Sequence, residues 1–113
     1  MATLFTKIIK GEIPGQIIFE DSECAVIADI QKQAPQHFLV IPKKELRSVA
    51  HASEQDKVLM GHLLLTAAKV ARDLGIAETG YRLVINTGMD GGQSVDHLHI
   101  HLLGGRPMSW PPG

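Results

Sequence analysis

Three histidines near the end of the chain, His97, His99 and His101, alternate with apolar residues. On an extended strand, alternate side chains point to opposite faces, so the three imidazoles share one face while Leu98 and Ile100 share the other. A neutral imidazole, with an ordinary pKa of about 6.5, is a competent nucleophile at neutral pH. A second imidazole can stabilise charge on a phosphate, and a third can orient the first. The spacing therefore favours a phosphoryl-transfer site.

Two other interpretations of the histidine cluster stay open. Alternate Cα atoms lie about 6.7 Å apart along a strand, so the outer two histidines lie about 13 Å apart and all three cannot reach one metal ion. A pair of these histidines with a distant ligand such as His37 could still bind a metal. In the other interpretation, the imidazoles only line a solvated face of a sheet. The residues around the cluster bear on this choice.

The residues before the cluster are typical of a phosphate pocket. Asn86 lies on the preceding predicted strand in phase with Val84, and a glycine-rich loop over residues 88–92 leads from this strand to the histidines. Glycines allow successive backbone N–H groups to approach an anion, and Ser94 adds a hydroxyl at the exit of the loop. These groups favour phosphate binding. His62, by contrast, stands alone in a helical pattern, and we interpret it as structural.

Length and composition point to one compact domain. The 113 residues, of which 44% are hydrophobic, suffice for a single core over residues 1–113. The formal net charge of −1 supplies no excess cation for a polynucleotide backbone, and no segment has the roughly 20 apolar residues of a membrane span. The single cysteine, Cys24, excludes an internal disulfide and is typical of a reducing compartment. We therefore expect a cytoplasmic protein that binds neither nucleic acid polymers nor membranes.

Hydrophobic periodicity predicts an α+β fold that positions these residues. A short N-terminal helix is expected over residues 5–13, and a helix of about twenty residues, capped by Ser53, over residues 53–74. Strands are expected over residues 17–20, 24–29, 37–41, 81–86 and 95–103. We predict an antiparallel sheet of about five strands with the long helix on one face and the histidine site on the other. Residues 104–113 contain three prolines and are expected to form an extended tail.

The segment 97–103 resembles the histidine triad motif, His-φ-His-φ-His-φ-φ, where φ is an apolar residue. Other segments resemble the HINT branch of the histidine triad (HIT) superfamily, namely residues 29–44, Asn86, residues 91–95 and the tail 104–113. The triad alone is also similar to that of the Fhit-like dinucleoside polyphosphate hydrolases. Ser94 and the tail with its tryptophan resemble HINT proteins in particular. The resemblance covers nearly the whole chain.

The resemblance implies a homodimeric purine nucleoside phosphoramidase that cleaves the P–N bond of adenosine or guanosine 5′-phosphoramidates, accepts acyl-adenylates and needs neither metal nor cofactor. His99 would attack the phosphorus to give a nucleotidyl-histidine, and His101 would contact the phosphate. His97 and His37 would form a hydrogen-bond chain behind the nucleophile. Asp29 would accept the ribose hydroxyls. The further residues implied to bind the nucleotide or its phosphate are Ile30, Asn86, Gly92, Gln93 and Ser94. The residues implied to form the base pocket are Phe5, Ile8 and Ile27. The tail is implied to cross toward the partner subunit, where Trp110 would contact the partner's site.

Two places depart from the HINT pattern. Ile27 and Ala28 stand where HINT proteins often have Phe and His, and an aliphatic wall offers shape but no offset stacking to a base. Asp96 stands where a Tyr is common, and alternation points its carboxylate away from the histidines. Two alternatives to a phosphoramidase are a dinucleoside polyphosphate hydrolase of the same superfamily and a non-catalytic nucleotide-binding or scaffold protein.

Overall fold

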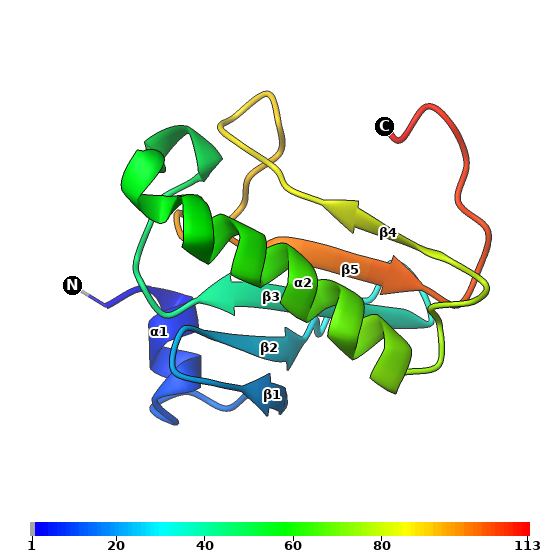
Figure 1. The fold of residues 1–113 in the computed structure, drawn as a ribbon, viewed down its shortest axis with the longest axis horizontal. Coiled ribbons are helices and arrows are strands. Elements are labelled where there is room, and N and C mark those ends of the chain that lie inside the picture. The colour runs from blue at the N-terminus through cyan, green and yellow to red at the C-terminus, as the bar shows by residue number, and fades with distance from the viewer. Residues whose placement is uncertain (1) are drawn as a thin grey trace.

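The computed structural model describes residues 2–113, and its central element is a five-stranded antiparallel sheet (Figure 1). The strands are β1 (Ile17–Glu20), β2 (Cys24–Ala28), β3 (Gln36–Pro42), β4 (Tyr81–Val84) and β5 (Ile100–Gly104). Their order across the sheet is β1-β2-β3-β5-β4, and each neighbouring pair is antiparallel. The central strand β3 therefore joins the N-terminal hairpin to β5. The predicted fold class is confirmed.

The long helix α2 (Lys57–Asp73) crosses the front face of the sheet in Figure 1. Its residues Leu63, Ala67 and Val70 are buried in the main apolar core, which includes residues from β2, β3 and β5. A 3₁₀ turn, η2 (Glu54–Asp56), precedes α2, and another, η1 (Val49–His51), lies before that. Ser53 and Asp56 form a capping box on η2, so the helix predicted over residues 53–74 starts with a 3₁₀ turn.

The short helix α1 (Leu4–Ile9) covers the opposite face of the sheet. The predicted helix over residues 5–13 ends earlier, because Gly11 adopts a left-handed conformation with φ of 79°. Phe5 packs with Ile27, Leu39 and Ile41 in a second apolar cluster. Successive residues of β2 and β3 alternate between the two clusters, so these strands are buried on both faces.

Two predicted strands are longer than the observed ones. β4 ends at Val84 instead of Asn86, and β5 begins at Ile100 instead of Val95. The tail after β5 runs along the right-hand side of Figure 1. Arg82 of β4 donates to the Ser109 carbonyl of this tail at 2.8 Å. No helix within residues 2–113 combines the length and the apolar character that crossing a membrane requires.

Candidate active site

The segment before β5 carries the first two triad histidines and is bound to the end of β3 and to the chain that follows it. His97 Nε2 donates to the Pro42 carbonyl at 2.8 Å, and the Leu98 N–H donates to the Leu46 carbonyl at 2.7 Å. These contacts take the place of ladder bonds, so the strand predicted over residues 95–103 is wrong in its first five residues. The alternation of faces holds nevertheless, because Leu98 packs in the core under α2.

His99 is 4% exposed and has the geometry of a nucleophile. Its Nδ1 lies 2.7 Å from the main-chain carbonyl oxygen of His97. Because a carbonyl only accepts, Nδ1 carries the proton, and the neutral ring has its lone pair on Nε2. The ring of Phe5 packs against the imidazole in an edge contact, with centroids 5.0 Å apart. His99 is thus held in one tautomer, with Nε2 as its basic nitrogen.

His101 is held in the complementary tautomer by a second chain of hydrogen bonds. The Gln33 N–H donates to His37 Nδ1 at 3.0 Å, so the neutral His37 ring carries its proton on Nε2. His37 Nε2 donates to His101 Nδ1 at 2.9 Å, and Asp29 Oδ2 lies 3.3 Å from the same His37 nitrogen. The His101 proton is therefore on Nε2. His101 offers an N–H donor beside the basic nitrogen of His99, with ring centroids 5.1 Å apart.

The hydrogen-bond chain that the resemblance implied behind the nucleophile is divided into two parts. His37 binds His101 and not His99. His97 reaches His99 through its main-chain carbonyl, while its buried ring bonds to the Pro42 carbonyl and the Thr3 hydroxyl. The three triad imidazoles consequently do not line one pocket.

Burial favours the neutral form of the imidazoles in the site. Burial lowers the pKa of His101 to about 4, assisted by the adjacent His99 and His37 rings and opposed by the Asp29 carboxylate. Burial likewise lowers the pKa of His99 and of His37 below 6.5, and Asp29 again opposes the shift. At neutral pH, His99 therefore keeps the lone pair that a nucleophile needs.

His99 and His101 open into a pocket of about 340 Å³ between α1 and the sheet. Most of its wall is apolar, and its polar groups include a carboxylate, a hydroxyl and the two imidazoles. The predicted site residues that line it are Phe5, Ile8, Ile27, Asp29, Ile30, Ser94, His99 and His101. An apolar cavity with a few convergent polar groups suits a small organic ligand that carries a charged group.

Three residues predicted to bind the nucleotide do not line this pocket. Asn86 donates to the Gly91 carbonyl at 2.7 Å, and the N–H groups of Gly92 and Gln93 donate to carbonyls of the same loop. The loop over residues 86–93 is therefore closed on itself in this structure, and Ser94 is the residue that it brings to the pocket. The nucleotide contacts of the three loop residues stay predictions.

The remaining predicted residues lie at the rim of the pocket or outside it. Ile30 lines the pocket but is 94% exposed, and Trp110 is 83% exposed in the tail. Asp96 is exposed and lies 3.4 Å from Arg47, so its carboxylate faces away from the pocket, as the alternation predicted. Trp110 contributes nothing to the pocket of its own chain.

Leu39, Val95 and Thr3 belong to the site or its support but are absent from the predicted set. Leu39 pairs with His101 across β3 and β5, and its phase with His37 could have identified it. Val95 has no local signal, because the chain bends where a strand is predicted. Thr3 carries the signal of a helix cap, but its contact with His97 spans 94 positions and has no sequence signature.

Within residues 2–113, two groups of side chains bring three metal-ligand atoms within 4.8 Å of one another: Asp29 with His37 and His101, and Asp21 with Cys24 and His62. The first group lies at the pocket and combines His37 with one triad histidine, whereas the metal-binding alternative combined His37 with a pair of triad histidines. The second lies where the β1–β2 turn meets α2, and there His62 Nε2 is 2.7 Å from Asp21 Oδ2. A test of the site's chemistry must therefore include a metal chelator.

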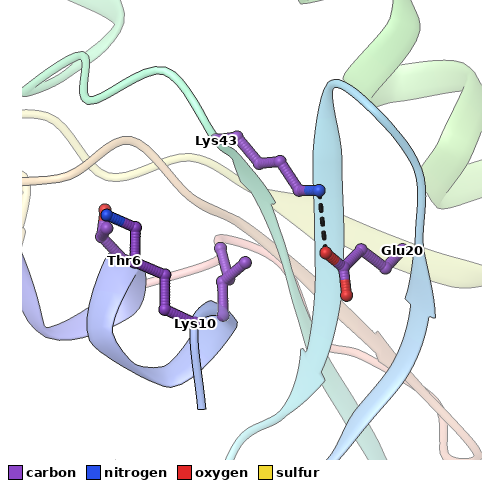
Figure 2. A pocket seen from close by; sticks show the side chains of 5 residues that line it. Thr6, Lys10, Glu20 and Lys43 are labelled. Atoms are coloured by element: carbon purple, nitrogen blue, oxygen red, sulfur yellow. Dashed lines mark ion pairs between the residues drawn. The ribbon is translucent and has the colours of Figure 1, made fainter. Parts of the chain in front are cut away.

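A second hollow, of about 240 Å³, lies on another side of α1 (Figure 2). It is lined by Thr6, Ile9, Lys10, Glu20 and Lys43, and the ion pair of Lys43 with Glu20, at 2.8 Å, is drawn as a dashed line. Its lining, all within the described part of the chain, includes no histidine. The hollow therefore lacks the imidazoles that the larger pocket has.

Known proteins resemble this chain over nearly its whole length. The HIT domain family model matches residues 10–108. An uncharacterised HIT-like protein of Synechocystis sp. is 55% identical over 111 residues, which are 98% of this chain and 96% of that protein. The crystal structure of a HIT family hydrolase from Legionella pneumophila gives a TM-score of 0.96 at 47% identity, covering 99% of this chain and 100% of that one. The structure of a HIT family hydrolase from Clostridium thermocellum gives a TM-score of 0.92 at 47% identity, covering 95% of this chain and 93% of that one. This chain belongs to the HIT domain family.

Proposed function

We propose that this protein is a nucleoside phosphoramidase, which hydrolyses the P–N bond of purine nucleoside 5′-phosphoramidates and accepts acyl-adenylates. The observation that carries the proposal is the pairing of a basic His99 Nε2 with a His101 Nε2–H donor in one pocket. The first supplies an electron pair to phosphorus, and the second stabilises charge on the phosphate oxygens. The similarity to proteins described as HIT family hydrolases supports a hydrolytic reaction.

The proposed reaction has two steps. His99 Nε2 attacks the phosphorus, the P–N bond breaks, and the amine leaves with the bonding electron pair and takes up a proton. Water then attacks the phosphorus of the nucleotidyl-histidine and the bond to Nε2 breaks. One proton of the water goes to the solvent and replaces the solvent proton that the amine took up, and the other leaves with the nucleoside monophosphate. The lowered pKa of His99 supports the second step, because a less basic imidazole is a better leaving group.

The remaining pocket residues suit the nucleoside part of this substrate. Asp29 Oδ1 accepts from the Gln31 N–H at 2.8 Å and Oδ2 lies 3.3 Å from His37 Nε2, so the carboxylate is fixed. Its oxygens keep further lone pairs that can accept from a ribose hydroxyl. Ile8 and Ile27 provide an aliphatic wall against which a flat base can pack. We infer that this wall selects a base by shape, since aliphatic side chains cannot stack on it as an aromatic ring does.

The direct test is release of adenosine monophosphate from adenosine 5′-phosphoramidate in excess chelator. The unmodified protein is expected to turn over, whereas His99→Ala should lose at least about a thousandfold in kcat and still bind adenosine monophosphate. His62→Ala is the matched control, because His62 is a histidine outside the pocket. Turnover that survives in His99→Ala would overturn the assignment of the nucleophile.

Other outcomes of the same assay point to the alternative functions. Turnover that stops in chelator and returns with zinc would support a metal held by the cluster of Asp29, His37 and His101. Faster hydrolysis of a diadenosine polyphosphate than of the phosphoramidate would make the protein a dinucleoside polyphosphate hydrolase. Tight nucleotide binding without turnover of either substrate would leave a nucleotide-binding protein.

A further inference from the structure

The first triad histidine lies away from the pocket, yet both of its ring nitrogens have partners. His97 is fully buried, and because its Nε2–H donates to the Pro42 carbonyl, Nδ1 must accept. The Thr3 hydroxyl lies within hydrogen-bonding distance of Nδ1 and donates to it. A buried ring nitrogen without a partner is unfavourable, so Thr3 satisfies a requirement that the Pro42 contact creates.

Thr3 is itself fixed from two sides. Its backbone N–H donates to Glu45 Oε2 at 2.9 Å, and its hydroxyl oxygen accepts the Thr6 N–H at 3.1 Å as the cap of α1. Glu45 precedes Leu46, whose carbonyl accepts from the triad segment at Leu98. The first turn of α1, the segment after β3 and the triad segment are thus joined at one point.

This junction bears on His99 through the backbone of His97. The carbonyl of His97 accepts the His99 Nδ1–H, and this bond places the lone pair on Nε2. A His97 ring held at both nitrogens restricts the rotation of the peptide group that carries this carbonyl. Phe5, two residues after Thr3, packs on both rings, with centroids 5.8 Å from His97 and 5.0 Å from His99.

We propose that Thr3 is a positioning residue of the active site. Its hydroxyl holds the His97 ring, and the His97 carbonyl in turn keeps the basic nitrogen of His99 directed at the substrate. The inference rests on the proposed function, because the step that it supports is the attack of His99 on phosphorus. Thr3 lines no part of the pocket and acts only through His97.

The test compares three variants in single-turnover formation of the nucleotidyl-protein. Thr3→Val keeps the shape and removes the donor, and it is expected to slow nucleotidyl transfer by roughly tenfold to a hundredfold with KM within about twofold. Thr3→Ser restores the donor and should keep the rate within about threefold. Thr6→Val is the matched control, because the Thr6 hydroxyl donates to Glu45 and not to His97.

A purely structural role of Thr3 gives a different result. Because Thr3 caps α1, Thr3→Val should also lower the thermal midpoint, so the rates are measured well below it. A Thr3→Val protein that is less stable but transfers the nucleotidyl group at the rate of the unmodified protein overturns the inference.

The ¹⁵N shifts of the imidazoles separate failure of this inference from failure of the proposed function. In the unmodified protein we expect His97 Nδ1 as an acceptor and His99 Nδ1 protonated. Absence of turnover in the unmodified protein would reject the phosphoramidase proposal. In that case the His99 ¹⁵N shifts still test the positioning role of Thr3. Shifts that are the same in Thr3→Val as in the unmodified protein overturn this role, and changed shifts support it.

Discussion

The three triad histidines have the same side chain but different hydrogen-bond partners, and these partners assign them different chemistry. His97 has both nitrogens engaged inside the protein, so it positions rather than reacts. The His97 carbonyl leaves His99 with a basic Nε2, whereas His37 leaves His101 with an Nε2–H donor. Had His99 and His101 the same tautomer, the pocket would contain two bases or two donors and could not both attack and stabilise a phosphate.

Activity is expected to fall on acidification only below pH 6.5. His99 acts as a neutral base, and burial lowers its pKa, so kcat/KM is full above the folded-state pKa and is lost as the pH drops through it. The measurement is kcat/KM for adenosine 5′-phosphoramidate from about pH 8 down to about pH 4, with circular dichroism at each pH to confirm that the fold persists. An acid limb at or above pH 6.5 in a folded protein would contradict the neutral-nucleophile assignment.

The secondary-structure elements follow local patterns, except where distant residues bind the chain. Strand alternation and the 3.6-residue period of α2 predict the sheet, the long helix and the two faces correctly, because these patterns express burial of each element against the next. The bend at residues 95–99 depends on bonds of His97 to Pro42 and of Leu98 to Leu46, more than fifty positions away. No local pattern contains such contacts.

In the candidate site too, local sequence patterns predict some features, while others depend on contacts between distant residues. Ser94, His99 and His101 could be predicted to lie together because the loop and the triad motif are adjacent in the sequence, and Asp29 through the family resemblance. The choice of partner for His37, and the engagement of Thr3 with His97, depend on tertiary geometry. The sequence thus indicated which candidate side chains meet at the pocket, but it did not indicate the hydrogen bonds that set their protonation.

The helix α2 contributes to stability through one face, and two of its leucines test this. Leu63 is fully buried against the sheet, whereas Leu65, two positions along, is 72% exposed. We expect Leu63→Ala to lower the free energy of unfolding by about 2–5 kcal/mol, and Leu65→Ala by less than about 0.5 kcal/mol in the monomer. Urea denaturation at matched protein concentration measures both, and equal losses would contradict the assignment of the faces.

At the scale of the whole molecule, several large apolar side chains outside the pocket are exposed. Val58 and Leu65 are exposed on α2, and Ile85 is exposed just beyond the edge strand β4. Trp110 is also exposed, although Arg82 binds the neighbouring Ser109 carbonyl and fixes the tail. Exposed apolar patches mark interaction surfaces, and we propose that a second copy of the chain covers them.

Removal of residues 110–113 tests whether the tail serves the site of the partner subunit. If Trp110 lies on the leaving-group side of that pocket, truncation should change relative kcat/KM among phosphoramidates of different amines by about fivefold or more. Affinity for adenosine monophosphate should stay within about twofold, because the proposed nucleotide-binding residues that line the pocket belong to a single chain. Sedimentation equilibrium of the full and truncated chains establishes the oligomeric state in which each is assayed. Trp110→Phe is the matched control, because it keeps an aromatic ring at this position. Equal changes in amine selectivity and in nucleotide affinity would contradict a leaving-group role of the tail. A full-length chain that is monomeric and active would show that the tail does not act at the site of a partner subunit.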